Sequence, residues 1–326
     1  MERREFLKRV GMTGIAVIGS ALGAAWLHDL RSGAAYFRDR ESKKTISLKS
    51  YHVDRVAGAV DMAIIRGKDP DKMMRAGLGE MGGIGSFIQK GDIVVIKPNV
   101  AFDRSAALGA TTNPDVLKAV ARLCREAGAR KIIVADNPIN QPEGCFFKSG
   151  IQQAAEEAGA EVMLPKSSAF ALAKIGGEAV KTWPMFSRPF EHATKVIGVA
   201  PCKDHNLCSA SMTMKNWYGL LGGGRDQFHQ QIHTVIADFA HMIKPSFVVL
   251  DATRILMQNG PTGGRLSDVV EGDTLVIGTD MVAVDTFGYT LFKRDPDKLD
   301  YVHKAEARGL GSTKWKEQNW REVLAG

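Results

Sequence analysis

The sequence predicts an α/β fold, a layered and mostly parallel sheet with flanking helices that leaves room for two α/β lobes. Residues 93–96 form a continuous apolar run, which is typical of a strand buried on both faces of a parallel sheet. Asn113-Pro114-Asp115 then combines an N-cap, a proline at the first helical position and an early acid, so a helix begins here and runs to Ala127. A second apolar strand, 131–135, follows, and this β-α-β succession is the pattern of a parallel sheet with right-handed crossovers.

The other predicted elements continue this alternation. A helix begins at Asp69-Pro70-Asp71 and runs to Met81, whereas residues 53–65 mix apolar and charged positions and are ambiguous. Residues 166–192 are expected to be irregular, either an excursion or a seam between lobes. Further helices are expected near 148–158, 230–242, 281–293 and 298–307, and further strands at 161–164, 195–200, 247–250 and 274–277. We therefore expect an α/β domain over residues 53–326, preceded by a linker over 31–52.

The composition argues against two classes of function. Hydrophobic residues make up 44% and charged residues 24%, as in ordinary globular proteins. The net charge is +7, but the sequence has no dense Lys/Arg run interleaved with aromatic residues, which argues against a nucleic-acid partner. The four cysteines lack C-x-x-C spacing, so no iron–sulfur cluster is expected. Cys124 falls on the apolar stripe of a helix, and Cys202 and Cys208 are a candidate disulfide in an oxidising compartment.

The N-terminus has the layout of an export signal. In MERREFLKRVGMTGIAVIGSALGAAWL a basic segment precedes the uncharged residues 10–27. Residues 3–8, RREFLK, resemble the twin-arginine (Tat) export motif. That resemblance implies that the Tat machinery exports the folded protein to the periplasm, often with a cofactor already loaded. Residues 1–30 are either a cleaved signal or, because the apolar stretch nearly reaches bilayer length, an uncleaved anchor.

Polar and ionisable residues gather where the predicted strands end. In open α/β sheets ligands bind beyond the carboxyl ends of the strands, so these groups are expected to meet in one pocket for a small molecule or a metal. They are Lys97 and Asn99, then Asp136, then Cys202, Lys203, Asp204 and His205, then Asp251 and Arg254, and finally Asp280. Asp280 also suits a helix cap. Asp285, inside an apolar helical turn, is expected to face a partner in the pocket.

The stretch 205–233, HNLCSASMTMKNWYGLLGGGRDQFHQQIH, concentrates the most chemistry. His229 and His233 are spaced i,i+4 at a predicted helix start, which suits two ligands of one transition metal, with His205 as a third. An exposed histidine pair explains the spacing equally well. The glycine triplet before Arg225 either lets backbone amides approach an anion, with Arg225 as a bidentate partner, or forms a turn. No G-x-G-x-x-G or G-x-S-x-G motif supports a nicotinamide enzyme or a serine hydrolase.

Several segments together resemble the DUF362 family, whose activity is not agreed. They are VVIKPNVAFD, TTNPDVLKAVARLCREAGARKIIVADNP, VAPCKDHNLCSASMTMKNWYGLLGGGRDQFH, FVVLDATRILMQNGPTGG, VIGTDMVAVDTFG and YVHKAEARGLGS, in this order. Many members carry a ferredoxin-like cysteine cluster, which implies redox chemistry, but this chain lacks one. The resemblance implies functional positions at Lys97, Asn99, Thr112, Lys203, His205, Lys215, Asn216, Arg225, His229, Asp251, Gly260, Pro261, Asp280 and Asp285.

Two functions are compatible with these observations. In the first, the protein is an exported enzyme, and its candidate catalytic residues are Lys203, His205, Asp251 and Asp280. Its ligand, a carboxylate, a phosphate or a metal, would be held by Lys97, Asn99, Thr112, Lys215, Asn216, Arg225 and Asp285. In the second, it is a periplasmic binding or maturation protein without turnover, associated with a membrane complex.

Overall fold

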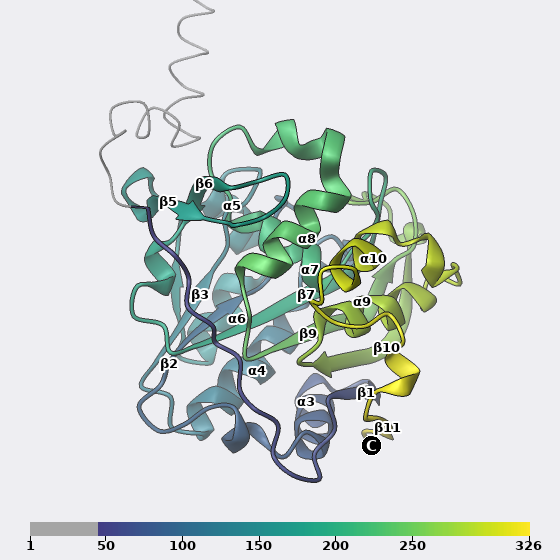
Figure 1. The fold of residues 1–326 in the computed structure, drawn as a ribbon. Coiled ribbons are helices and arrows are strands. Elements are labelled where there is room, and N and C mark those ends of the chain that lie inside the picture. The colour runs from purple at the N-terminus through teal and green to yellow at the C-terminus, as the bar shows by residue number, and fades with distance from the viewer. Residues whose placement is uncertain (1–44) are drawn as a thin grey trace, which may run out of the picture.

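The protein is built on one large mixed sheet. The computed structural model describes residues 45–326, and Figure 1 shows the sheet crossing the molecule between two layers of helices. The nine strands are β1 (Met62–Arg66), β2 (Ile93–Lys97), β3 (Lys131–Ala135), β4 (Glu161–Met163), β7 (Lys195–His205), β8 (Ser209–Ser211), β9 (Phe247–Leu256), β10 (Val269–Gly278) and β11 (Trp320–Leu324). Their order is β11-β1-β10-β9-β7-β2-β3-β4, with β8 paired to β7. The predicted fold class is confirmed.

Strand direction decides which ends of the strands share an edge. β2, β3, β4, β7 and β9 are mutually parallel along the order in which they pair. β10 is antiparallel to both of its neighbours, β9 and β1. The carboxyl end of β10 therefore lies at the opposite edge of the sheet from those of β2, β7 and β9.

Alternating strand residues build the two cores. In β2, Val95 packs on one face, whereas Val94 and Ile96 pack on the other, as period-two alternation requires. The face that holds Val94 is covered by α3 (Pro70–Glu80), α4 (Pro114–Glu126), α5 (Pro142–Lys148) and α6 (Ile151–Glu157). The opposite face is covered by α7 (Thr213–Asn216), α8 (Ile232–Met242), α9 (Met281–Thr290) and α10 (Asp300–Glu306). Both faces of the sheet are thus closed to solvent.

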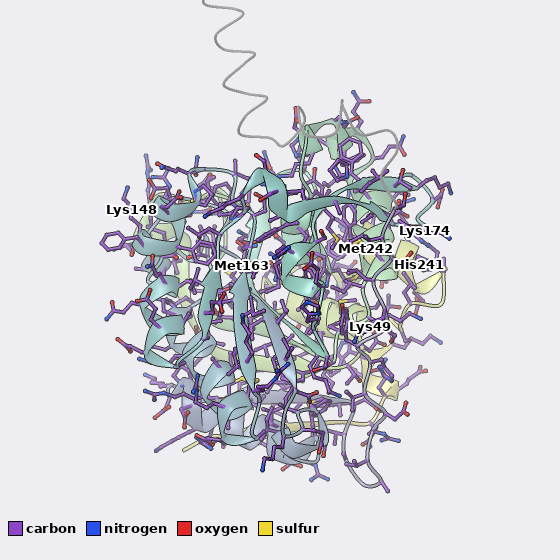
Figure 2. All side chains as sticks on the ribbon, turned by 90° about the vertical axis from the view of Figure 1, so that its left-hand side faces the viewer. Lys49, Lys148, Met163, Lys174, His241 and Met242 are labelled. Atoms are coloured by element: carbon purple, nitrogen blue, oxygen red, sulfur yellow. The ribbon has the colours of Figure 1, made fainter. Side chains whose placement is uncertain are left out.

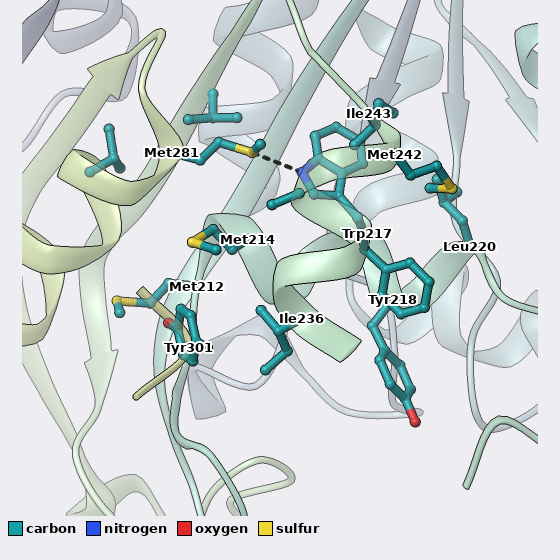
Figure 3. Packing of buried hydrophobic residues seen from close by; sticks show 14 of the residues in the cluster. Met212, Met214, Trp217, Tyr218, Leu220, Ile236, Met242, Ile243, Met281 and Tyr301 are labelled. Atoms are coloured by element: carbon teal, nitrogen blue, oxygen red, sulfur yellow. Dashed lines mark hydrogen bonds between the residues drawn. The ribbon is translucent and has the colours of Figure 1, made fainter. Parts of the chain in front are cut away.

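The second core fixes the turn that follows α7. Figure 3 shows Trp217 packed among methionine and aliphatic side chains, its indole Nε1 directed at Met281 Sδ at 3.1 Å. Trp217 is fully buried, and Gly198 of β7 lacks the Cβ that would otherwise lie 2.7 Å from its ring. This close approach seats the turn directly on the central strand, so residues 213–220 have a defined position over the sheet.

Several predicted boundaries are corrected. Residues 53–65, ambiguous in the sequence, end in strand β1. The helix expected near 148–158 is α6, which begins only at Ile151 after Gly150 at a φ of 76°, and α5, which precedes it, was not predicted. The region 166–192 contains a hairpin of β5 (Phe170–Lys174) and β6 (Thr182–Phe186). The strands that precede this region and those that follow it belong to the same large sheet. All four cysteines are free thiols, so the Cys202–Cys208 disulfide is not formed.

The start of the described chain lies along the β5 hairpin. The backbone N–H of Ile46 donates to Leu172 O at 2.9 Å, and residues 47–50 border a surface depression. Lys49, Lys174 and His241 line this depression, and Figure 2 faces the side that carries them. Within residues 45–326, no helix combines the length and the apolarity needed to cross a bilayer. The predicted export signal and most of the linker precede residue 45 and lie outside the described residues.

Candidate functional site

A cavity of about 270 Å³ opens at the carboxyl ends of β2 and β7. After β2 the chain forms β3 and β4 on one side of it in the sheet, and then crosses back to form β7 and β9 on its other side. This reversal is a topological switch point, where open α/β sheets leave a crevice for ligands. We call it the β2–β7 cavity. Its polar and aromatic lining consists of Lys97, Asn99, Phe102, Asp136, Asn137, Lys203, His205, Asn206, Ser211, Lys215, Asn216, Tyr218, Arg225, His229 and Thr262.

The cavity wall carries four cationic side chains and one carboxylate, Asp136. Asp136 Oδ1 lies 2.8 Å from Lys97 Nζ and accepts from the Asn137 N–H at 3.0 Å. Its other oxygen accepts from the Val100 N–H at 2.7 Å. Asp136 is therefore committed to Lys97 and to backbone amides. Within the described chain, no carboxylate forms an ion pair with the remaining three cations, Lys203, Lys215 and Arg225.

Two asparagines connect Lys97 to Lys203 through a buried hydrogen-bond network. Lys97 Nζ donates to Asn216 Oδ1 at 2.7 Å, and the same oxygen accepts from Asn99 Nδ2 at 3.2 Å. Asn99 Oδ1 in turn accepts from Lys203 Nζ at 3.1 Å. The backbone of Asn99 is held by Thr112, whose Oγ1 accepts from the Asn99 N–H and donates to Val199 O, both at 2.8 Å. Thr112 thus acts from behind the wall and does not line the cavity.

The three lysines differ in how many hydrogen-bond acceptors they have. Lys97 Nζ has three, since it also donates to Pro98 O at 2.8 Å. Lys203 Nζ has two, Asn99 Oδ1 and Ala110 O, the latter at 2.6 Å. Lys215 Nζ has none among residues 45–326, and it lies over the Tyr218 ring, 4.8 Å from the ring centroid. Burial lowers the pKa of all three ammonium groups, most strongly for Lys203.

Arg225 is anchored by only part of its guanidinium. Its Nη1 donates to Asn137 O at 3.0 Å and to Leu221 O at 3.2 Å, both backbone carbonyls. Nη2 and Nε have no hydrogen-bond acceptor within the described chain, and desolvation by burial lowers the pKa of the group. The glycine triplet 222–224 is not part of the cavity wall; it forms the turn that returns the chain to Arg225. A guanidinium held at one nitrogen and free at the others is positioned to receive an anion.

His205 is a neutral hydrogen-bond donor. Its Nδ1 accepts from the Leu207 N–H at 3.1 Å, so the proton of the neutral ring resides on Nε2. Burial, together with the charges of Lys215 and Lys203, lowers the pKa of His205 to about 2. A metal-binding histidine needs one unprotonated nitrogen toward the metal and usually donates from the other. In His205 the unprotonated nitrogen is already taken by a backbone N–H, so the ring does not fit a metal ligand.

The three predicted metal ligands do not meet. His229 lies exposed at the rim of the cavity, in the 3-10 helix Arg225–Gln231, because α8 begins only at Ile232. His233 lies in α8, where it stacks on Tyr301 with ring centroids 6.5 Å apart and faces Asp300 at 3.8 Å. Among residues 45–326, no group of three or more histidine, cysteine or acidic side chains is arranged to hold a metal ion.

The three acids predicted for the site lie outside the cavity. Asp251 lies within β9 and accepts from the Asn113 N–H at 2.7 Å and Thr253 Oγ1 at 2.6 Å. Asp280 lies at the opposite edge of the sheet, where it caps α9 by accepting from the Val282 N–H at 2.8 Å. Its placement follows from the antiparallel direction of β10.

Asp285 is buried beneath α7. It accepts from the backbone N–H groups of Thr213 and Met214, the start of the helix that carries Lys215 and Asn216. Its partner is therefore the support of the cavity wall and not a ligand. Gly260 supports the wall by allowing a close backbone contact, because a Cβ there would lie 1.9 Å from Asp204 O. Pro261, the next residue, lines the cavity itself.

Some of the wall was missed by reasoning from sequence. Asp136 was expected in the pocket as a strand-end residue but was given no role there, and Phe102 and Tyr218 were not predicted to line it. Gly219 also lines the wall, and the structure shows why a glycine is needed there. A Cβ at this position would lie 2.6 Å from Asp136 Oδ1 and 2.8 Å from Lys97 Nζ. The glycine lets the turn after α7 close over this ion pair.

The fold and the site define an α/β protein with a cationic cavity at the switch point of its sheet. Residues 94–290 match the family described as domain of unknown function (DUF362), and since they make up more than half of the chain, it belongs to that family. The chain is also similar to Thylakoid-associated protein sll1697 of Synechocystis sp., with 24% identity over 250 residues that cover 74% of this chain and 75% of that protein. The whole cavity wall lies within the DUF362 match.

Proposed function

We propose that the β2–β7 cavity binds a small organic anion through its carboxylate or phosphate group. The observation that carries this proposal is the unbalanced charge of the wall, where Lys203, Lys215 and Arg225 have no carboxylate partner in the described chain. Cations that are partly or fully removed from water are costly unless an anion pairs with them. A bound anion supplies that partner.

The donors of the wall suit such a ligand. Arg225 offers Nε and Nη2, and Lys203 has one N–H left after its bonds to Asn99 and Ala110. His205 adds a neutral Nε2–H, which can bond an oxygen without adding charge. Phe102, Tyr218, Ile139 and Leu207 supply an apolar side to the cavity. The ligand is therefore expected to carry a compact carbon skeleton beside its anionic group, within a volume of about 270 Å³.

Titration calorimetry at constant ionic strength tests this function. We expect inorganic phosphate or small carboxylates such as pyruvate to bind to the wild-type protein, and the Arg225→Gln variant to lose about tenfold or more in affinity, since a charge-assisted bond is removed. The matched control is Lys131→Met, which removes a surface lysine paired with Glu161 at 2.7 Å on the same sheet. Absence of binding by every anion tried, or equal losses in the two variants, contradicts the proposal.

The protein's place in the cell is a second part of the proposal. We infer that the chain is exported by the Tat machinery and acts at a membrane surface, as an enzyme or as a binding or maturation protein of a membrane-associated complex. Support comes from the likeness of residues 3–8 to the twin-arginine motif and from the thylakoid association in the name of the Synechocystis relative. Replacing Arg3 and Arg4 by lysine is expected to retain the protein in the cytoplasmic fraction, whereas an unchanged distribution on fractionation contradicts export by this route.

A further inference from the structure

Lys215 is the one lysine of the cavity wall whose amine is not used by the protein's own hydrogen bonds, as far as the described chain extends. Lys97 is held by three acceptors and Lys203 by two, so both are fixed parts of the wall. Lys215 instead lines the cavity with its Nζ over the Tyr218 ring, which also lines it, 4.8 Å from the ring centroid. A lysine kept only for its charge would gain from acceptors that fix its position, as Lys97 does. An amine without acceptors retains a nitrogen that is free to react.

The surroundings of Lys215 favour the reactive, neutral form of the amine. Lys215 is partly buried in the cavity wall, and Arg225 and Lys203 line the same wall. Desolvation, followed by the charge of Arg225, lowers the pKa of Lys215. A lysine that is desolvated beside other cations is the arrangement that activates an amine as a nucleophile toward carbonyl carbon.

We propose that the amine of Lys215 forms a Schiff base with a small 2-oxo carboxylate bound in the β2–β7 cavity. This inference rests on the proposed function, because Arg225 is assigned to hold the carboxylate. The neutral Nε2–H of His205 is assigned to the carbonyl oxygen. The apolar lining from Phe102 and Ile139 accommodates the carbon chain.

The chemical step is balanced without an oxidant or a reductant. The lone pair of Lys215 Nζ forms the N–C bond, the π pair of the carbonyl moves to its oxygen, and a net transfer of one proton from the nitrogen to that oxygen gives a carbinolamine. The nitrogen lone pair then forms the C=N bond as the C–O bond breaks, the oxygen takes a second proton and leaves as water, and the nitrogen gives up its remaining proton. One amine and one carbonyl thus give one imine and one water. Lys203, with one N–H not engaged by the protein, lines the same wall and is placed to donate to the departing oxygen.

Reductive trapping tests the inference on the full-length protein. The protein is incubated with pyruvate and sodium cyanoborohydride, which reduces the imine to a stable secondary amine, and the modified peptides are mapped by mass spectrometry. We expect Lys215 to be labelled at least about tenfold faster than the exposed Lys131, because it combines a bound carbonyl with an activated amine. Phosphate, which offers no carbonyl but competes for the anion site, is expected to slow the labelling of Lys215 and not that of Lys131.

The matched variant is Lys215→Arg, which places a permanent positive charge at this position and removes the nucleophilic amine. We expect it still to bind pyruvate in calorimetry, because Arg225 holds the carboxylate and the new guanidinium adds a positive charge, and to lose rapid labelling altogether. Lys131→Met, which removes only the exposed lysine, is expected to retain rapid labelling at Lys215. If wild-type protein binds pyruvate but Lys215 reacts no faster than Lys131, or if the fast label falls on Lys203, the inference is overturned while the proposed function stands. If neither pyruvate nor phosphate binds, both are overturned.

Discussion

The carboxylate of Asp285 accepts a hydrogen bond at 2.8 Å from the backbone N–H of Thr213, the first residue of α7. It also accepts from the Met214 N–H at 3.0 Å and from the Tyr301 hydroxyl at 3.2 Å. The first N–H groups of a helix have no partner within the helix, and here a side chain from α9 supplies one. An acid in the middle of an apolar helix is thereby tied to the short turn that places Lys215 and Asn216 on the cavity wall.

Asp285→Ala is expected to weaken anion binding without removing any group from the cavity. The variant leaves the buried N–H groups of Thr213 and Met214 without an acceptor, which costs about 1–3 kcal/mol in the free energy of unfolding for each unsatisfied group. Because α7 is then less firmly held, affinity for the anion is expected to fall by about tenfold. Urea unfolding and calorimetry measure the two effects separately.

The control for this prediction is Asp280→Ala, which removes the cap of α9 at the opposite edge of the sheet. Because Asp280 also accepts from the Ser312 N–H at 2.9 Å and from Gln318 Nε2 at 2.7 Å, the variant is expected to lower stability by about 1–3 kcal/mol and to leave anion affinity unchanged. If the two variants lose affinity equally, the specific link between Asp285 and the cavity wall is wrong.

Asp136→Asn is expected to be among the most destabilising single changes in the cavity wall. Lys97 and Asp136 are both almost fully buried, so the variant leaves the Lys97 ammonium without its counter-charge. Removing one partner of a buried pair costs about 3–5 kcal/mol, whereas breaking an exposed pair costs about 0–1 kcal/mol. Lys131→Met, which breaks the exposed pair with Glu161, is the comparison for urea unfolding. Equal effects of the two substitutions would show that Lys97 is neutral in the folded protein.

The sequence predicted those parts of the site that depend on local pattern. Lys97, Lys203 and His205 were assigned to one edge because apolar runs indicate buried parallel strands, and the carboxyl ends of such strands meet. Asp280 was wrongly assigned to the same edge because the direction of its strand could not be predicted. Whether a strand is parallel or antiparallel depends on its pairing partners, and nothing within residues 274–277 reveals that β10 runs the other way.

The histidine pair and the acid of α9 show a second limit of sequence reasoning. The i,i+4 spacing of His229 and His233 has meaning only if both residues lie on one helix, and here α8 begins between them. Asp285 was correctly expected to have a partner, but that partner is a backbone terminus, which leaves no pattern in the sequence. Tyr218 and Phe102 reach the cavity through tertiary packing alone.

Acid is expected to destabilise the protein through His205. The pKa of His205 is about 2 in the folded protein, against 6.5 for the unperturbed side chain. Above pH 6.5 the ring is neutral in both states and contributes no penalty. Below pH 6.5 the histidine binds a proton in the unfolded chain but not in the folded protein, so the free energy of unfolding falls by about 1.4 kcal/mol for each pH unit.

The measurement is the difference in unfolding free energy between the wild-type protein and His205→Gln, followed from pH 8 to pH 5. Asp285, whose pKa burial raises to about 6, titrates within this range in both proteins, so its effect cancels in the difference. The wild type is expected to lose stability relative to the variant only below about pH 6.5. A difference that stays constant with pH would mean that His205 becomes protonated in the folded state.

Anion binding is expected to take up protons. Burial lowers the pKa of Lys203 and Lys215, and a bound anion favours their charged forms, so binding shifts both pKa values upward again. Affinity is therefore highest at low pH, where the lysines are already charged, and decreases as the pH rises through the lowered pKa values of the free protein.

Calorimetry with phosphate in two buffers of different ionisation enthalpy gives the number of protons taken up. Lys203→Arg, whose guanidinium stays charged, is expected to take up fewer protons and to show a weaker loss of affinity with rising pH. Binding without proton uptake at any pH from 7 to 9 would mean that both lysines remain fully charged in the empty cavity, and that their burial is offset by water or by the protein's own dipoles.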